Sequence, residues 1–133
     1  MRVVLDTNVF VSGIHWTGNY CSMIIKDWIE TKFDLIISIS IIEEITETLK
    51  NFKIPLSMED ILMWENMIVK NSLLVEPQEK IEIVKDDKDD NKFIEAAVEG
   101  KADYIITQDN HLLKIKEFRG IMIISPEEFL KVI

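Results

Sequence analysis

Residues 2–8 read RVVLDTN, a short β-branched run that stops at a carboxylate, Asp6. Similar apolar runs recur along the chain, and helix signals alternate with them. Five strands are predicted, at residues 2–5, 35–38, 73–75, 104–107 and 121–124, and residues 81–84 are a further candidate for extended chain. Short apolar strands that alternate with capped helices are typical of a parallel sheet covered on both faces, so the sequence predicts an α/β fold.

Capping residues mark where the helices begin. Six helices are predicted, over residues 19–32, 40–50, 57–69, 90–99 and 111–116, and from residue 126 onward. Ser40 and Glu43 have the spacing of a capping box. That interpretation makes Glu43 a structural residue and leaves Glu44 free for other work.

The chain has 133 residues, 47% apolar and 29% charged, which indicates one globular domain over residues 1–133. Its longest near-apolar run, residues 35–42, is far shorter than the roughly 20 residues that span a bilayer. The single cysteine, Cys21, excludes an intrachain disulfide. These features favour a cytoplasmic protein with no membrane partner. The net charge of −9 excludes a broad basic surface for nucleic acid, so phosphate chemistry requires a local site with a metal.

Several carboxylates fall just after predicted strands or in the first turn of the following helix. They are Asp6, Glu43, Glu44, Asp86, Asp87, Asp89, Asp90 and Asp109. The carboxyl ends of strands in an open α/β sheet meet at one crevice, so acids from four segments are expected to converge there. Unpaired carboxylates in one pocket repel each other, and hard cations such as Mg²⁺ or Mn²⁺ relieve that repulsion. His15, His111 and Cys21 are scattered along the sequence, which argues against zinc.

Each acid taken alone also has a structural interpretation. Asp90 is placed to cap its helix, and Asp109 is placed to end a turn. A charged run such as residues 86–90 is more often a solvated loop, so at most two of its acids are expected at the site. The combination of acids, rather than any one of them, favours a metal centre.

Four motifs occur in order along the chain. They are VVLDTNVFVSG at 3–13, Ser38 followed by Glu44 and Leu49, DKDDNKFIEAA at 87–97, and ADYIITQDNHLL at 102–113. Together with SPEEFL at 125–130, they resemble the PIN domain family of metal-dependent ribonucleases. The branch that they resemble is VapC-like, the toxin components of toxin–antitoxin pairs. The resemblance implies a three-layer α/β/α domain with a mainly parallel five-stranded sheet.

The resemblance also implies a site and its partners. The implied metal ligands and catalytic residues are Asp6, Glu44, Asp90 and Asp109, the supporting polar groups are Asn8 and Thr107, and the second-choice acids are Asp87 and Asp89. The implied chemistry is endonucleolytic cleavage of RNA by water activated by Mg²⁺ or Mn²⁺. The implied partners are an RNA substrate, an antitoxin protein and a second copy of the chain in a homodimer. The sequence departs from the branch at three positions, which hold Lys88, Gln108 and His111.

Two other functions stay open at this point. A Mg²⁺-dependent phosphatase on a similar sheet, of the haloacid dehalogenase type, requires Asp-x-Asp after the first strand, and Asp6-Thr7-Asn8 lacks the second carboxylate. A catalytically silent PIN-like module that only binds a partner is the other alternative. The complete set of four acids argues against it.

Overall fold

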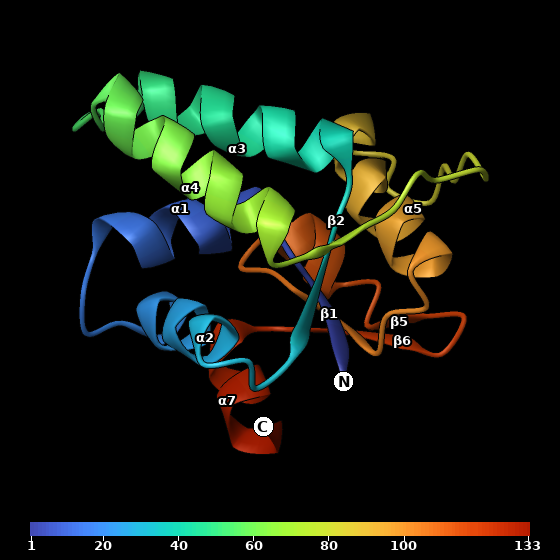
Figure 1. Ribbon diagram of the computed structural model, residues 1–133. Helices are drawn as coiled ribbons and strands as arrows, with labels where there is room; N and C mark the ends of the chain where they lie inside the picture. Colours follow the sequence, from blue (N-terminus) through green and yellow to red (C-terminus); the bar gives the residue numbers. More distant parts are fainter.

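The β-branched runs of the sequence form the strands of one sheet with helices on both faces (Figure 1). The structure is a computed structural model and describes all 133 residues. The strands are β1 (Arg2–Leu5), β2 (Asp34–Ile37), β3 (Leu73–Leu74), β4 (Tyr104–Ile106), β5 (Glu117–Phe118) and β6 (Ile121–Ile124). The helices are α1 (Thr7–His15), α2 (Tyr20–Ile29), α3 (Ile39–Asn51), α4 (Met58–Lys70), α5 (Asn91–Glu99), α6 (Asn110–Leu113) and α7 (Pro126–Val132), and a 3₁₀ turn, η1 (Lys88–Asp90), precedes α5.

Strand β1 lies in the interior of the sheet, whose order is β3-β2-β1-β4-β6-β5. Every neighbouring pair is parallel except β5 and β6. Leu5 of β1 is aligned with Ile106 of β4, so these two strands end side by side. Val3, Val4 and Leu5 are buried whichever face they point to, as expected for a parallel sheet covered on both sides.

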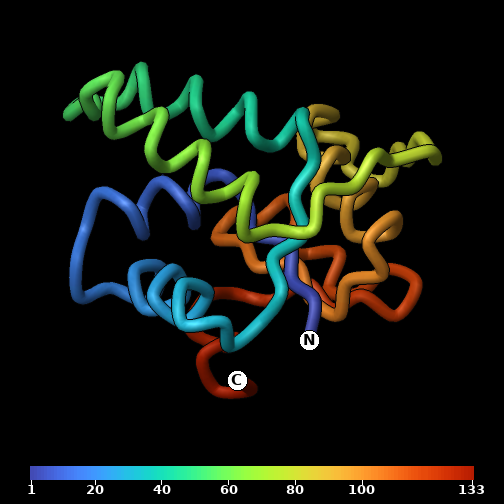
Figure 2. The backbone as a smooth tube through the Cα atoms, in the orientation of Figure 1, coloured from blue at the N-terminus to red at the C-terminus, as the bar shows by residue number.

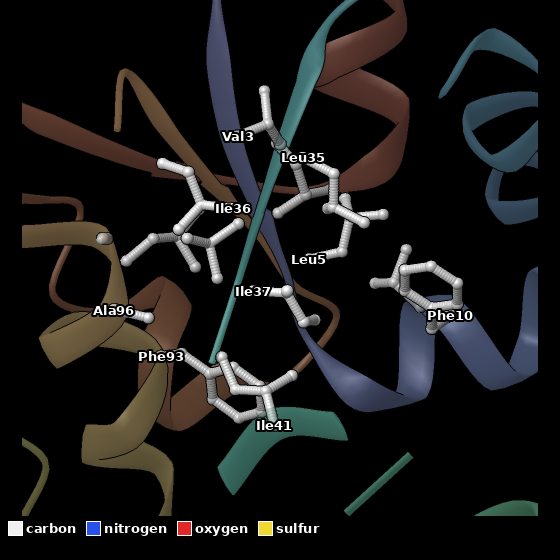
Figure 3. Packing of buried hydrophobic residues seen from close by; sticks show 14 of the residues in the cluster. Val3, Leu5, Phe10, Leu35, Ile36, Ile37, Ile41, Phe93 and Ala96 are labelled. Atoms are coloured by element: carbon white, nitrogen blue, oxygen red, sulfur yellow. The ribbon is translucent and has the colours of Figure 1, made fainter. Parts of the chain in front are cut away.

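Two layers of helices enclose the sheet. Helix α5 packs on β1, β2 and β4, and Figure 3 shows its Phe93 and Ala96 on one side of the strands and Phe10 of α1 on the other. Phe10 packs edge-to-face on Trp28 of α2, and Phe129 of α7 packs in the same manner on Tyr104 of β4. The predicted three-layer α/β/α architecture is therefore confirmed.

Helices α3 and α4 form an antiparallel pair that extends past the carboxyl edge of the sheet (Figure 2). This pair places the first turn of α3 beside α5. No helix of the protein has the length and apolar character that crossing a bilayer requires.

The sheet has six strands instead of the predicted five. The additional strand, β5, pairs antiparallel with β6 across a two-residue turn, Arg119-Gly120. Both turn residues have positive φ, 50° and 85°, which matches the type I′ turn of a tight hairpin. Glu117 and Phe118 lie in the stretch KIKEFRG, outside every apolar run of the sequence, so the pattern did not reveal this strand.

Two other segments differ from the predictions. The sequence predicted no helix over residues 7–15, but α1 forms there because Asp6 caps it and its Val9, Phe10 and Val11 are buried. Residues 81–84 are not a strand. Their backbone N–H groups at Ile81 and Val84 donate to side chains of α5, not to a neighbouring strand.

The predicted capping box at Ser40 and Glu43 is wrong. The N-cap of α3 is Ser38, whose hydroxyl accepts a hydrogen bond from the backbone N–H of Ile41 at 3.3 Å. The helix starts directly after β2, and this early start turns Ile41, Ile42, Ile45 and Leu49 toward the core. Ser40 and Glu43 are exposed.

We expect Ser38→Ala to lower the free energy of unfolding by about 1 kcal/mol, because the replacement leaves the first turn of α3 without its cap. Ser40→Ala removes the same hydroxyl two residues later and should change stability by less than about 0.5 kcal/mol. Urea unfolding of the two variants compares them. Equal losses, or a larger loss for Ser40→Ala, would contradict the placement of the cap.

Candidate active site

The carboxyl ends of β1 and β4 bring together the first two site residues, Asp6 and Thr107. The backbone N–H of Asp6 donates to Ile106 at 2.9 Å, and the Thr107 hydroxyl donates to Asp6 Oδ2 at 2.6 Å. Asp6 is 4% exposed and Thr107 is fully buried. Thr107 therefore holds the carboxylate of Asp6 in a fixed orientation.

Asp6 also caps α1 by accepting a hydrogen bond from the backbone N–H of Asn8. Asn8 thus contributes its backbone N–H group to holding Asp6, and the residue is otherwise exposed. Burial raises the pKa of Asp6, the hydrogen bonds from Thr107 and Asn8 oppose that rise, and the charges of Asp109 and Glu44 add to it. The carboxylate of Asp6 therefore lies in a strongly negative environment.

Asp109 is linked to Asp6 through the same threonine. The backbone N–H of Asp109 donates to the Thr107 hydroxyl at 2.9 Å, and Asp109 Oδ1 accepts from the backbone N–H of His111 at 2.8 Å. Asp109 is the N-cap of the short α6. Gln108, between the two site residues, is exposed.

Asp90 lies at the junction of η1 and α5 and is 9% exposed. Its side chain makes no capping hydrogen bond, and its Oδ2 atom is buried without any hydrogen-bond partner. Burial, together with the negative charges of Asp87, Asp6 and Asp109, raises the pKa of Asp90 to about 7. A buried carboxylate oxygen without a partner is costly, and such an atom indicates a missing cation or donor.

The other acids of the 86–90 segment have protein partners. Asp87 caps η1 through the backbone N–H of Asp89. Asp86 pairs with His111 and Lys114. Asp89 is exposed and pairs with Lys92 at 3.0 Å. Asp90 is the one acid of this segment that is buried.

Glu44 of α3 lies at the edge of this cluster and forms an ion pair with Lys92 of α5. The sequence pattern alone predicts no partner for Lys92. The sequence contained one clue to its location, because Lys92 follows Asp89 by three residues and so lies on the same helical face. The contact between Lys92 and Glu44 joins residues 48 positions apart, so it can be found only from the folded structure.

The residues present fit a hard divalent cation. Asp6, Asp90 and Asp109 offer only carboxylate oxygens, the ligands that Mg²⁺ and Mn²⁺ prefer, and the unpaired Oδ2 of Asp90 lacks a positive partner. No three His, Cys, Asp or Glu side chains already form a closed ligand set. Cation binding would therefore require these side chains to move from the positions that they have in this structure.

Comparisons with a family model, a related sequence and a solved structure each show similarity. The sequence model of the family described as "PIN domain" matches residues 2–111. The uncharacterized protein MJ1680 of Methanocaldococcus jannaschii is 31% identical, in an alignment that covers 98% of this chain and 90% of that protein. The crystal structure of VapBC2 from Rickettsia felis, bound to a DNA fragment from their promoter, contains a chain that superposes with a TM-score of 0.64. That match covers 94% of this chain and 98% of the other at 12% identity, and it shows a shared fold.

Proposed function

Because this chain belongs to the PIN domain family, whose members are typically nucleases, we propose that it is a metal-dependent endoribonuclease and the toxin component of a toxin–antitoxin pair. The family resemblance inferred from the four sequence motifs is confirmed by the match over residues 2–111. The observation that carries the proposal is the buried, unpaired Oδ2 of Asp90 at the edge of the sheet where Asp6 and Asp109 also lie. A metal-dependent centre for phosphodiester cleavage uses such a group of carboxylates to hold its cation.

In this proposal Asp6, Asp90 and Asp109 hold Mg²⁺ or Mn²⁺, and Glu44 is the fourth acid of the cluster. Such a cation, when bound, lowers the pKa of water and neutralises charge on a phosphodiester. Thr107 orients Asp6 and, through its hydroxyl, fixes the backbone of Asp109. These hydrogen bonds keep two of the three acids in place before any substrate arrives.

Three cationic side chains that could contact RNA already have carboxylate partners. Lys114 pairs with Asp86, Arg119 pairs with Glu79, and Lys92 pairs with Glu44. With a net charge of −9 the surface as a whole repels phosphate. Affinity for RNA would therefore depend on the local centre, and we expect weak, non-specific binding elsewhere.

We also propose that the chain forms a homodimer, that it binds an antitoxin protein, and that it acts in the cytoplasm. The R. felis structure is a VapBC2 complex, and its fold is shared. Exposed apolar side chains lie along α4, at Met58, Leu62 and Val69, and continue to Leu73. A row of such residues favours contact with another protein.

One experiment tests the activity. Single-stranded RNA is incubated with the purified chain in Mn²⁺, in Mg²⁺ and in EDTA, and para-nitrophenyl phosphate is offered in parallel. We expect metal-dependent cleavage of RNA that leaves 5′-phosphate and 3′-hydroxyl ends, no cleavage in EDTA and no hydrolysis of the small phosphate. Hydrolysis of the small phosphate alone would favour a phosphatase. Metal binding without hydrolysis of either substrate would favour the silent binding module.

A further inference from the structure

Lys92 lies against Glu44, at the edge of the acidic cluster. Its ammonium group forms ion pairs with Glu44 of α3 and with Asp89 of η1, the second at 3.0 Å. The side chain of Lys92 is only 12% exposed, and that of Glu44 is 27% exposed. Lys92 is therefore a largely buried cation with two carboxylate partners.

The fold puts Lys92 at the meeting point of three surface hollows. One of about 570 Å³ lies between the start of α3 and the end of β3, one of about 430 Å³ lies against η1, and one of about 450 Å³ runs along α3. Lys92 and Ser40 line all three. Figure 1 shows the first turn of α3 next to α5, the arrangement that brings Glu44 and Lys92 together.

The four acids divide into two groups by their partners. Asp90 has an oxygen with no partner, and Asp6 and Asp109 receive hydrogen bonds from neutral donors. Glu44 already has a full positive charge against it. A second divalent cation would have to displace Lys92 from Glu44 and would then lie beside its ammonium group, which is electrostatically unfavourable. One cation at the three aspartates faces no such competition.

We propose that Lys92 takes the place of a second metal ion: it keeps Glu44 out of the ligand set, so that each chain binds a single divalent cation through Asp6, Asp90 and Asp109. This inference rests on the proposed function, because it concerns the metal of that same centre. Lys92 is then a positioning residue that acts through Glu44, and the positive charge that two-ion nucleases obtain from their second ion comes from the chain itself.

Manganese binding by the whole chain tests this inference, with free Mn²⁺ counted by electron paramagnetic resonance and affinity measured by calorimetry. We expect one Mn²⁺ per chain for the parent and two for Lys92→Met, since the loss of the ammonium group frees Glu44. Lys88→Met is the matched control. Lys88 is exposed on η1, so its replacement removes one positive charge and leaves the ion pair between Lys92 and Glu44 in place. It should bind one ion, and so should Lys92→Arg, which keeps the positive charge.

A second comparison does not depend on how Lys92→Met folds. Glu44→Gln should change the Mn²⁺ affinity of the parent by less than about threefold, whereas Asp90→Asn should weaken it by at least about tenfold. Two ions in the parent, one ion in a folded Lys92→Met, or a tenfold loss in Glu44→Gln would each overturn the role of Lys92 and leave the nuclease proposal standing. Absence of Mn²⁺ binding in every variant, with RNA present as well, would overturn the proposed metal centre and this inference with it.

Discussion

We expect Asp6→Asn to reduce RNA cleavage by about 10³-fold or more while the protein remains folded. A catalytic cation contributes several kcal/mol to transition-state stabilisation, and each 1.36 kcal/mol is a factor of ten in rate. Asparagine caps helices as well as aspartate does, so α1 should keep its first turn. The amide oxygen of asparagine can still accept the hydrogen bond from Thr107. The replacement therefore removes a negative charge and leaves the local structure in place.

The control for this variant is Asp34→Asn. Asp34 is the first residue of β2, so it lies at the opposite end of the sheet and is exposed. It should retain full cleavage activity. Mn²⁺ should raise the melting temperature of the parent and of Asp34→Asn and have little effect on Asp6→Asn. Undiminished cleavage by Asp6→Asn would show that the chemistry occurs elsewhere in the molecule.

The metal-free protein should become less stable as the pH rises through neutrality. The pKa of Asp90 is raised to about 7 in the folded protein from an ordinary value of 3.8. A raised pKa means that the folded state favours the protonated carboxyl group. The resulting contribution to stability is complete below the pKa of Asp90 in the unfolded chain, and it is lost as the pH rises through the pKa in the folded protein. Between about pH 4 and pH 8 we expect a loss of roughly 2–4 kcal/mol in the free energy of unfolding. Asp6, whose pKa is also raised, acts in the same direction.

Urea unfolding in EDTA at pH 5 and at pH 8 measures this loss. Asp90→Asn should flatten the dependence and should be more stable than the parent at pH 8, because it carries no charge to bury. The exposed acids Glu79, Asp86 and Asp89 have lowered pKa values, so they affect stability only at more acidic pH. Equal stability of the parent at the two pH values would contradict the buried, negatively charged environment of Asp90. Saturating Mn²⁺ should restore stability to the parent at pH 8.

The sequence was most informative where burial and position depend on local pattern. All five predicted strands exist, and Asp6 and Asp109 lie where strand ends were expected to place them, because β-branched runs and the residues after them are local features. The family resemblance ranked Asp90 ahead of Asp87 and Asp89, but only the structure shows that Asp90 is the buried one. The three residues share one charged run, and the way η1 turns determines which carboxylate is buried.

Other features depended on contacts between distant segments. The β-branched residues of α1 have low helix propensity, and the packing of α1 against α2 and α3 outweighs it. The start of α3 shifted from Ser40 to Ser38 because the helix begins where β2 ends and not at the best capping-box spacing. Lys92 and Glu44 meet because α3 and α5 are neighbours in space. No pattern within a single segment contains that information.

The hydrogen bond between Thr107 and Asp6 has a consequence for the order of events during protein synthesis. It joins residues 101 positions apart in the sequence. Strand β4, which pairs with β1, belongs to the same distant segment. A nascent chain therefore carries Asp6 and Glu44 long before β4 exists, and contacts between such distant segments form late. The proposed centre, which also needs Thr107 and Asp109, therefore stays incomplete until translation of the 133 residues has almost finished.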